Sequence, residues 1–363
     1  MNFVLFEIIR DFLLLLLFLR LVILPAFAAA PSNQKLQEFL NLGEQSQLSH
    51  DMRRAEMDYL KAIEEAAKFG PKSPETQESE ARLAAVYVLQ GKLEAAAPHY
   101  QKAKDIALAL KKEGHEAPES FVWLDDLSDA YQLQAATTQP EYCYLHCIEL
   151  RKAISPRHKN LASVETQFGS LLLMNGKVAE GDKYLKEGYA LSATLDGAES
   201  HNTGKLCLIL ANAYNIAGKL TDAEKFCKEA IAITLKRSGN LNTVLANLRR
   251  MDAVILTKMG KTKEALSEVK TAMELHKRLD GVKSAEYAYD LSCLATIYMD
   301  SHRLNEAEAT VTESLAIFQT QPHVIKELRT TTLALAVKIA RLQHHNSQAA
   351  KWEAELKTWE AKR

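Results

Sequence analysis

The side chains best suited to chemistry are three soft metal ligands near the middle of the chain. Cys143 and Cys147 are four residues apart, which places both thiols on one face of a helix, and His146 is adjacent. Zinc prefers thiolate and imidazole ligands in proteins, so these three side chains could hold a metal ion. A fourth ligand is not evident nearby, and the spacing differs from that of a zinc knuckle. The alternative, which we favour, is that buried cysteines fill a narrow space between helices.

Other patterns of catalytic residues are weak. The chain contains no glycine-rich phosphate loop, no GxSxG motif and no HExxH motif. His344 and His345 fall in a turn, where solvated side chains explain them better than a ligand site. Asp125, Asp126 and Asp129 lie on a charged helix face without a partner acid or base. We therefore predict that the protein is not an enzyme and needs no cofactor. An enzyme or metal-binding protein centred on the cysteine–histidine cluster is the alternative.

The helices that would position any functional group show a repeated pattern, and its clearest copy spans residues 210–230. We expect two helices there, joined by a turn at Gly218, since glycine readily adopts the positive φ that ends a helix. The small or apolar positions of this copy are Ala211, Tyr214, Ala223, Cys227 and Ala230. The last three are spaced so that they form one stripe, which we expect to face the first helix.

The small residue of the first helix recurs along the chain at intervals of 41 to 44 residues. It is found at Gly43, Ala84, Ser128, Gly169, Ala211, Ala253 and Ala295. The small residue of the second helix keeps the same period, with one degenerate unit, at Ala55, Ala96, Gly181, Ala223, Ala265, Ala307 and Ala349. Two positions that share one period of this length indicate a solenoid of stacked helix pairs.

This order of residues resembles the tetratricopeptide repeat, with units about one helical turn longer than the usual length of about 34 residues. The longer unit is similar to that of kinesin light chains and their bacterial relatives. The resemblance covers about residues 33–356 and implies an all-α superhelical solenoid of about eight helix pairs. The units are expected near residues 33–70, 78–112, 119–155, 161–195, 203–237, 245–279, 287–320 and 323–361.

In this family the first helices of successive pairs line the concave face, where peptides bind. The resemblance therefore implies a non-catalytic protein-interaction scaffold that binds an extended peptide or a partner protein there. The residues three before, one after and four after the small residue of each first helix should share one stripe. In the later units this stripe comprises Asp125, Asp129 and Gln132; Thr166, Ser170 and Leu173; Leu208, Asn212 and Asn215; Arg250, Val254 and Thr257; and Ser292, Thr296 and Met299.

Six residues on or beside this stripe are our candidates for partner binding. They are Lys205, Asn212, Asn215, Asn247, Arg250 and Tyr289. Asparagines can clamp a peptide backbone through both amide groups, and Lys205 and Arg250 favour acidic side chains. We expect shallow apolar pockets at Leu208, Val254 and Met299. The alternative is that the polar residues of the stripe are solvated and contact no partner.

The overall charge limits the kinds of partner. The chain has 45 Lys and Arg against 46 Asp and Glu, a balance that disfavours nucleic acid or an acidic membrane as the main target. Its length alone would suggest two or three domains of about 150 residues each. A solenoid, however, extends without separate cores, so we predict one solenoid over residues 31–363.

The first 30 residues lie outside the repeat. Residues 12–18 are all apolar, Arg20 interrupts the run, and Pro25 precedes a stretch of small residues that is typical of a cleavage site. We expect a signal peptide that is cleaved after Ala28 or Ala29, and an exported protein that is periplasmic or secreted. The alternative is an uncleaved membrane anchor, which would make the chain a membrane-tethered assembly subunit outside the cytoplasm. A membrane partner is expected only in that second case.

The five cysteines are an odd number, and all lie in the predicted repeats. Cys143 and Cys147 point the same way from one helix, which is poor geometry for a disulfide. Cys207 and Cys227, on facing helices of one unit, are the only plausible pair within a unit. Because Cys207, Cys227 and Cys293 fall on packing positions, we expect reduced thiols in the core.

Overall fold

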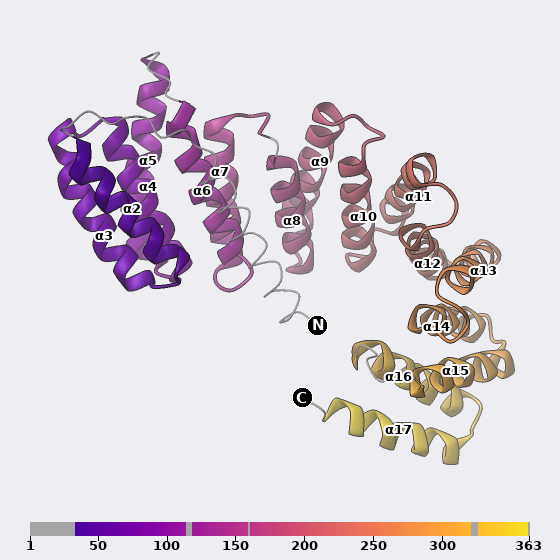
Figure 1. Cartoon of the computed structure of the whole chain (residues 1–363). Helices are drawn as coiled ribbons and strands as arrows, with labels where there is room; N and C mark the ends of the chain where they lie inside the picture. The colour runs from indigo at the N-terminus through magenta and orange to yellow at the C-terminus, as the bar shows by residue number, and fades with distance from the viewer. Residues whose placement is uncertain (1–32, 114–117, 159, 321–325, 362–363) are drawn as a thin grey trace. The chain divides into compact units, whose positions relative to one another are not determined.

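The computed structural model describes residues 33–113, 118–158, 160–320 and 326–361, and within these ranges it contains sixteen α-helices and no strand. The helices form eight consecutive pairs (Figure 1): α2 (Gln34–Leu48) and α3 (Met52–Ala66), α4 (Pro74–Leu89) and α5 (Leu93–Lys112), α6 (Pro118–Gln134) and α7 (Pro140–Ile154), α8 (Leu161–Met174) and α9 (Val178–Leu195), α10 (His201–Ile216) and α11 (Leu220–Ser238), α12 (Thr243–Lys258) and α13 (Thr262–Leu279), α14 (Ala285–Asp300) and α15 (Leu304–Gln319), and α16 (Lys326–Leu342) and α17 (Asn346–Glu360). The predicted all-α class is confirmed. The predicted signal peptide at residues 1–30 lies outside the described residues.

The chain divides into two compact bodies. The N-terminal body comprises the described residues up to Leu172 together with Lys183–Leu191, and the C-terminal body comprises Leu173–Asp182 and the residues from Ser192 onward. In the C-terminal body the first helices of successive pairs, α10, α12, α14 and α16, contact one another in turn. Each first helix also packs against its own second helix, and α12, α14 and α16 pack against the second helix before them. These four first helices therefore form one layer, which we call the first-helix layer.

The turn has one shape in seven of the eight pairs, whichever residue occupies it; the α6–α7 turn is longer, with Gln139 at φ 40°. Gly91, Gly176, Gly218 and Gly260 have φ angles of 73°, 78°, 74° and 74°, the conformation that the sequence predicts for Gly218 at the end of the first helix. His50, His302 and His344 occupy the same turn in the first and the last two pairs, with φ of 60°, 58° and 62°. Glycine adopts this conformation at no steric cost, whereas a histidine there is strained. The packing of the two helices therefore determines the conformation of the turn, and glycine only lowers the steric cost of that conformation.

A second glycine motif starts the first helices and was not recognised in the sequence. Gly70, Gly197, Gly239 and Gly281 have positive φ, and each is followed three residues later by a helix-capping residue, Ser73, Ser200, Asn242 or Ser284. Each cap accepts a hydrogen bond from the backbone N–H three residues further on. Such a cap contributes about 1 kcal/mol to helix stability. The first helices of these units therefore begin at well-defined points.

Small residues mark the places where helices approach most closely. The repeat alanines Ala84, Ala211 and Ala223 are fully buried. At Gly188 of α9, a Cβ atom would lie 2.6 Å from the backbone oxygen of Ala162 and 2.5 Å from Thr166 Oγ1 on α8. No real side chain tolerates such distances, so the α8–α9 contact requires glycine. This is the role that the repeat pattern predicts for its small residues.

All five cysteines are free and buried in the core. Burial raises the pKa of Cys143 to about 11 and the pKa values of Cys147, Cys207 and Cys293 to about 12. Cys227 Sγ lies 3.5 Å from the backbone oxygen of Leu248 on α12, so it faces the next pair and not Cys207. The thiols therefore serve as small apolar side chains, as expected.

Candidate partner-binding surface

The cysteine–histidine cluster of α7 is part of the packed core of the N-terminal body. Cys143 and Cys147 have no exposed surface. His146 packs against the rings of Tyr100, Tyr131 and Tyr142, with centroid distances of 4.7, 5.3 and 4.2 Å. Among the residues that the structure describes, no three His, Cys, Asp or Glu side chains are grouped to hold a metal ion. The geometry therefore assigns these residues to packing.

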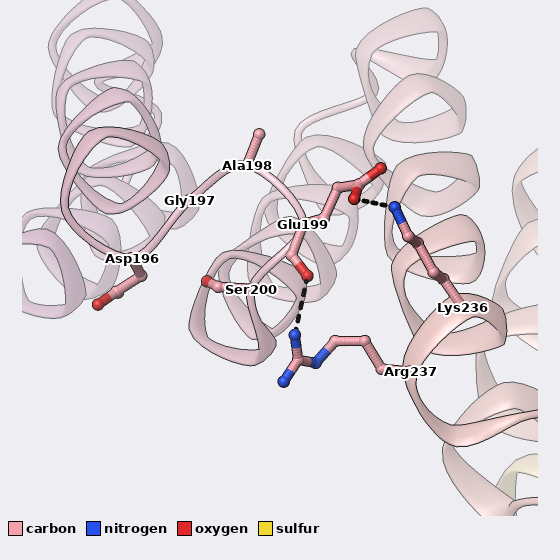
Figure 2. Close-up of a pocket in the computed structure, with 7 residues that line it drawn as sticks. All are labelled: Asp196, Gly197, Ala198, Glu199, Ser200, Lys236 and Arg237. Carbon is pink, nitrogen blue, oxygen red and sulfur yellow. Dashed lines mark hydrogen bonds and ion pairs between the residues drawn. The ribbon is translucent and has the colours of Figure 1, made fainter.

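A hollow of about 700 Å³ lies where the loop before α10 meets the end of α11 (Figure 2). Residues 196–200 line one side of it, and Lys236 and Arg237 line the other. Figure 2 shows both cations directed at Glu199: Lys236 forms an ion pair with its carboxylate, and Arg237 Nη1 donates to its backbone oxygen at 3.4 Å. These cations therefore tie the loop to α11, and we do not assign the hollow to a ligand.

The six predicted binding residues all lie on first helices of the C-terminal body, but they differ in exposure. Lys205 and Asn212 are exposed on α10. Asn215 on α10, Asn247 on α12 and Tyr289 on α14 are half-buried, whereas Arg250 on α12 is buried. The structure joins Asn247, Arg250 and Tyr289 in one cluster and Asn215 to another residue, Lys258. The six predicted residues and Lys258 therefore form two groups of contacting side chains and two exposed side chains, Lys205 and Asn212.

Arg250 is not the exposed cation that the sequence suggested. Its Nη1 donates to Asp290 Oδ1 at 3.1 Å, and its Nη2 donates to Glu286 Oε2 at 2.8 Å. Asp290 is fully buried and also contacts His276 Nδ1 of α13 at 2.6 Å. The guanidinium carbon stands 4.4 Å from the centre of the Tyr289 ring. Arg250 therefore joins α12 to α14, where two carboxylates about one repeat further along the chain neutralise its charge, and Asp290 extends this contact to α13.

Lys258 is a residue of this surface that the sequence analysis missed. It is exposed at the end of α12, and its Nζ donates to Asn215 Oδ1 at 2.7 Å. Val254 and Lys258 are four residues apart, so they share a face of α12. Extending the predicted stripe by one more helical turn would have found it.

At only one of the three stripe positions is the side chain never buried. The position three before the small residue is buried at Asp125, Thr166, Arg250 and Ser292, and half-buried at Leu208. The position four after it is buried at Leu173 and Met299, so the expected exposed pocket at Met299 is wrong. The position one after it is exposed or half-buried at Asp129, Ser170, Asn212, Val254 and Thr296. The covering helix differs from pair to pair: Arg151 of α7 contacts Asp125, Gly188 of α9 lies against Thr166, and α14 covers Arg250.

Comparisons with known proteins agree with this architecture. A tetratricopeptide-repeat family model matches residues 207–240. The Arabidopsis thaliana protein kinesin light chain-related 1 is 27% identical over 194 residues, which are 53% of this chain and 31% of that protein. The chain therefore matches about a third of the length of this relative.

One solved structure supports the fold, and a second is similar to part of the chain. The apo form of RapI is 11% identical, with a TM-score of 0.51, and the match covers 91% of this chain and 87% of that one. BtubC (BKLC) from P. vanneervenii is 18% identical, with a TM-score of 0.48, and the match covers 64% of this chain and 91% of that one. The chain therefore contains a tetratricopeptide repeat at residues 207–240, and its helix pairs and their period resemble the long units of kinesin light chains.

Proposed function

We propose that the chain is a non-catalytic scaffold that binds an extended peptide or a partner protein on the first-helix layer of the C-terminal body. The observation that carries this proposal is the exposure of polar side chains on that layer. Lys205 and Asn212 on α10 and Lys258 on α12 are exposed, and Ile216 at the end of α10 is exposed beside them. Polar groups held on a rigid helical layer are suited to contact a partner.

The charge of this layer favours a partner with acidic side chains. Helix α10 contains no Asp or Glu, and the only acidic residue of α12, Asp252, is buried. The exposed charges on these two helices include Lys205 and Lys258. The α10–α12 part of the layer therefore has exposed cations and no exposed carboxylate, so it attracts carboxylates and repels other cations.

Replacing Lys205 and Asn212 together by alanine is expected to weaken partner binding by about 1–3 kcal/mol, because polar contacts that are buried in the complex are lost. Both side chains are exposed, so the unfolding midpoint should hardly change. The partner is captured from the native organism with the wild-type chain, and its Kd is measured by calorimetry.

The matched control for this test lies on the second helix α13. Ser267→Ala with Lys270→Ala also removes one positive charge and one polar group, both from exposed positions. This control should bind the partner like the wild type. Loss of binding in the control, with normal binding by the Lys205 and Asn212 variant, would place the partner on the opposite layer.

We also propose that residues 1–30 direct export and are then removed. Within the part of the chain that the structure describes, no helix is both long and apolar enough to cross a bilayer. The support for export comes from the apolar run and the small residues near Ala28. The protein isolated from its native organism should begin near Ala29 or Ala30 and be found in the soluble fraction outside the cytoplasm. Mass spectrometry of its N-terminus tests this, and an intact N-terminus in the membrane fraction would select the anchor.

A further inference from the structure

Asn215 is held with its amide oxygen toward a cation. Lys258 Nζ donates to Asn215 Oδ1 at 2.7 Å and lies 3.5 Å from the backbone oxygen of the same residue. An ammonium group can only donate hydrogen bonds, so the amide atom that faces it must be the oxygen. The Nδ2 group of the planar amide therefore points away from Lys258.

Asn247 is held in the same way by a second cation. Arg250 Nη2 donates to Asn247 Oδ1, and a guanidinium group, like an ammonium group, has no acceptor. Arg250 cannot easily turn away, because Asp290 and Glu286 fix its two terminal nitrogens. The Nδ2 group of Asn247 therefore points away from Arg250.

We infer that Lys258 and Arg250 are positioning residues for partner binding, which hold Asn215 and Asn247 so that each amide presents a hydrogen-bond donor. This inference rests on the proposed function of the first-helix layer. The layer would then recognise an extended segment through acceptor oxygens of that segment. The two-sided amide clamp expected from the sequence needs the oxygen and the nitrogen of each asparagine together. At Asn215 and Asn247 the cation already occupies one lone pair of the amide oxygen, so the Nδ2 donor is the group that each side chain presents to a partner.

The first test separates positioning from folding at Lys258, because this side chain is exposed. A phage-displayed library of random peptides of about twelve residues is selected on the wild-type chain, and peptides that require Lys205 and Asn212 are synthesised. Lys258→Met should weaken their binding about fivefold or more, since Asn215 is then free to rotate. Lys258→Arg keeps the donor and should restore most of the affinity. Fluorescence anisotropy gives each Kd, and equal urea midpoints show that stability is not the cause.

The second test replaces the amide nitrogen that points away from the cation by a carboxylate oxygen of similar size. Asn215→Asp and Asn247→Asp keep the bond to the cation and strengthen it, so both variants should fold. Each replaces an outward donor by an acceptor, and the double variant should lose about tenfold or more in affinity. Ser267→Asp, exposed on α13, adds one negative charge outside the layer, and peptide binding should stay close to that of the wild type.

The outcomes distinguish this inference from the proposed function. If the library yields no peptide that depends on Lys205 and Asn212, the proposed function fails and the inference fails with it. If such peptides bind Lys258→Met or the double Asp variant as tightly as the wild type, the inference alone is overturned. Weaker binding in these variants, restored by Lys258→Arg and unaffected by Ser267→Asp, supports it.

Discussion

Replacing Asp290 by alanine is expected to lower the free energy of unfolding by about 3–5 kcal/mol. Asp290 is fully buried and is the shared partner of His276 and Arg250, at 2.6 and 3.1 Å. Without its carboxylate, the buried guanidinium keeps only Glu286 as an ionic partner, and the imidazole loses its hydrogen bond. Removing one member of a buried charged cluster costs more than the cluster itself contributes, because the remaining charge cannot be solvated. Urea unfolding of the wild type and the variant gives the difference.

Two further variants show whether burial is the cause. Glu306→Ala breaks an ion pair with Arg303 that is largely exposed, and it should leave the unfolding midpoint nearly unchanged. Arg250→Met with Asp290→Leu removes both charges and should recover much of the lost stability, since no unpaired charge remains on either residue. A loss for Asp290→Ala no larger than that for Glu306→Ala would show that the cluster is solvated and does not support the fold.

Replacing Ala223 by tryptophan should be far more damaging than the same change at Lys225, two residues along α11. Ala223 is fully buried at a close contact between the helices of its pair, whereas Lys225 is exposed. Overpacking a core site costs about 1–3 kcal/mol, and an indole in place of a methyl group is an extreme case. In a solenoid each pair also supports its neighbours, so the damage should spread beyond α11.

Thermal unfolding followed by circular dichroism compares the two tryptophan variants directly. Lys225→Trp introduces the same side chain into the same helix, so differences in helix propensity cancel. Equal melting temperatures for the two variants would mean that the assigned core face of α11 is wrong.

The helix pairs and their turns could be predicted because they depend on local chemistry. A small residue at every close contact and a residue able to adopt positive φ at every turn repeat visibly along the chain. Gly218 and Ala223 are examples, and the structure places both as expected. The capping residues, such as Ser200, were equally visible as Ser or Asn before a helix, but they were not used.

The accessible part of the binding surface could not be predicted, because accessibility depends on the next helix pair. Helical periodicity predicts which side of a helix a residue occupies. It does not predict whether another helix covers that side. Arg250 and Met299 lie on the predicted stripe, yet both are buried. The partners of Arg250 on α14 are 36 and 40 residues away in sequence, so no local pattern around Arg250 reveals them.

The buried thiols can serve as natural probes of local opening of the helix pairs. Cys143 and Cys147 lie on α7, and Cys207, Cys227 and Cys293 lie on α10, α11 and α14. Each is shielded from solvent, so a thiol reagent can reach it only when the surrounding helices separate. In a solenoid such openings occur pair by pair as well as globally. The labelling rates of the five thiols therefore record how the free energy of opening varies along the stack, without any engineered probe.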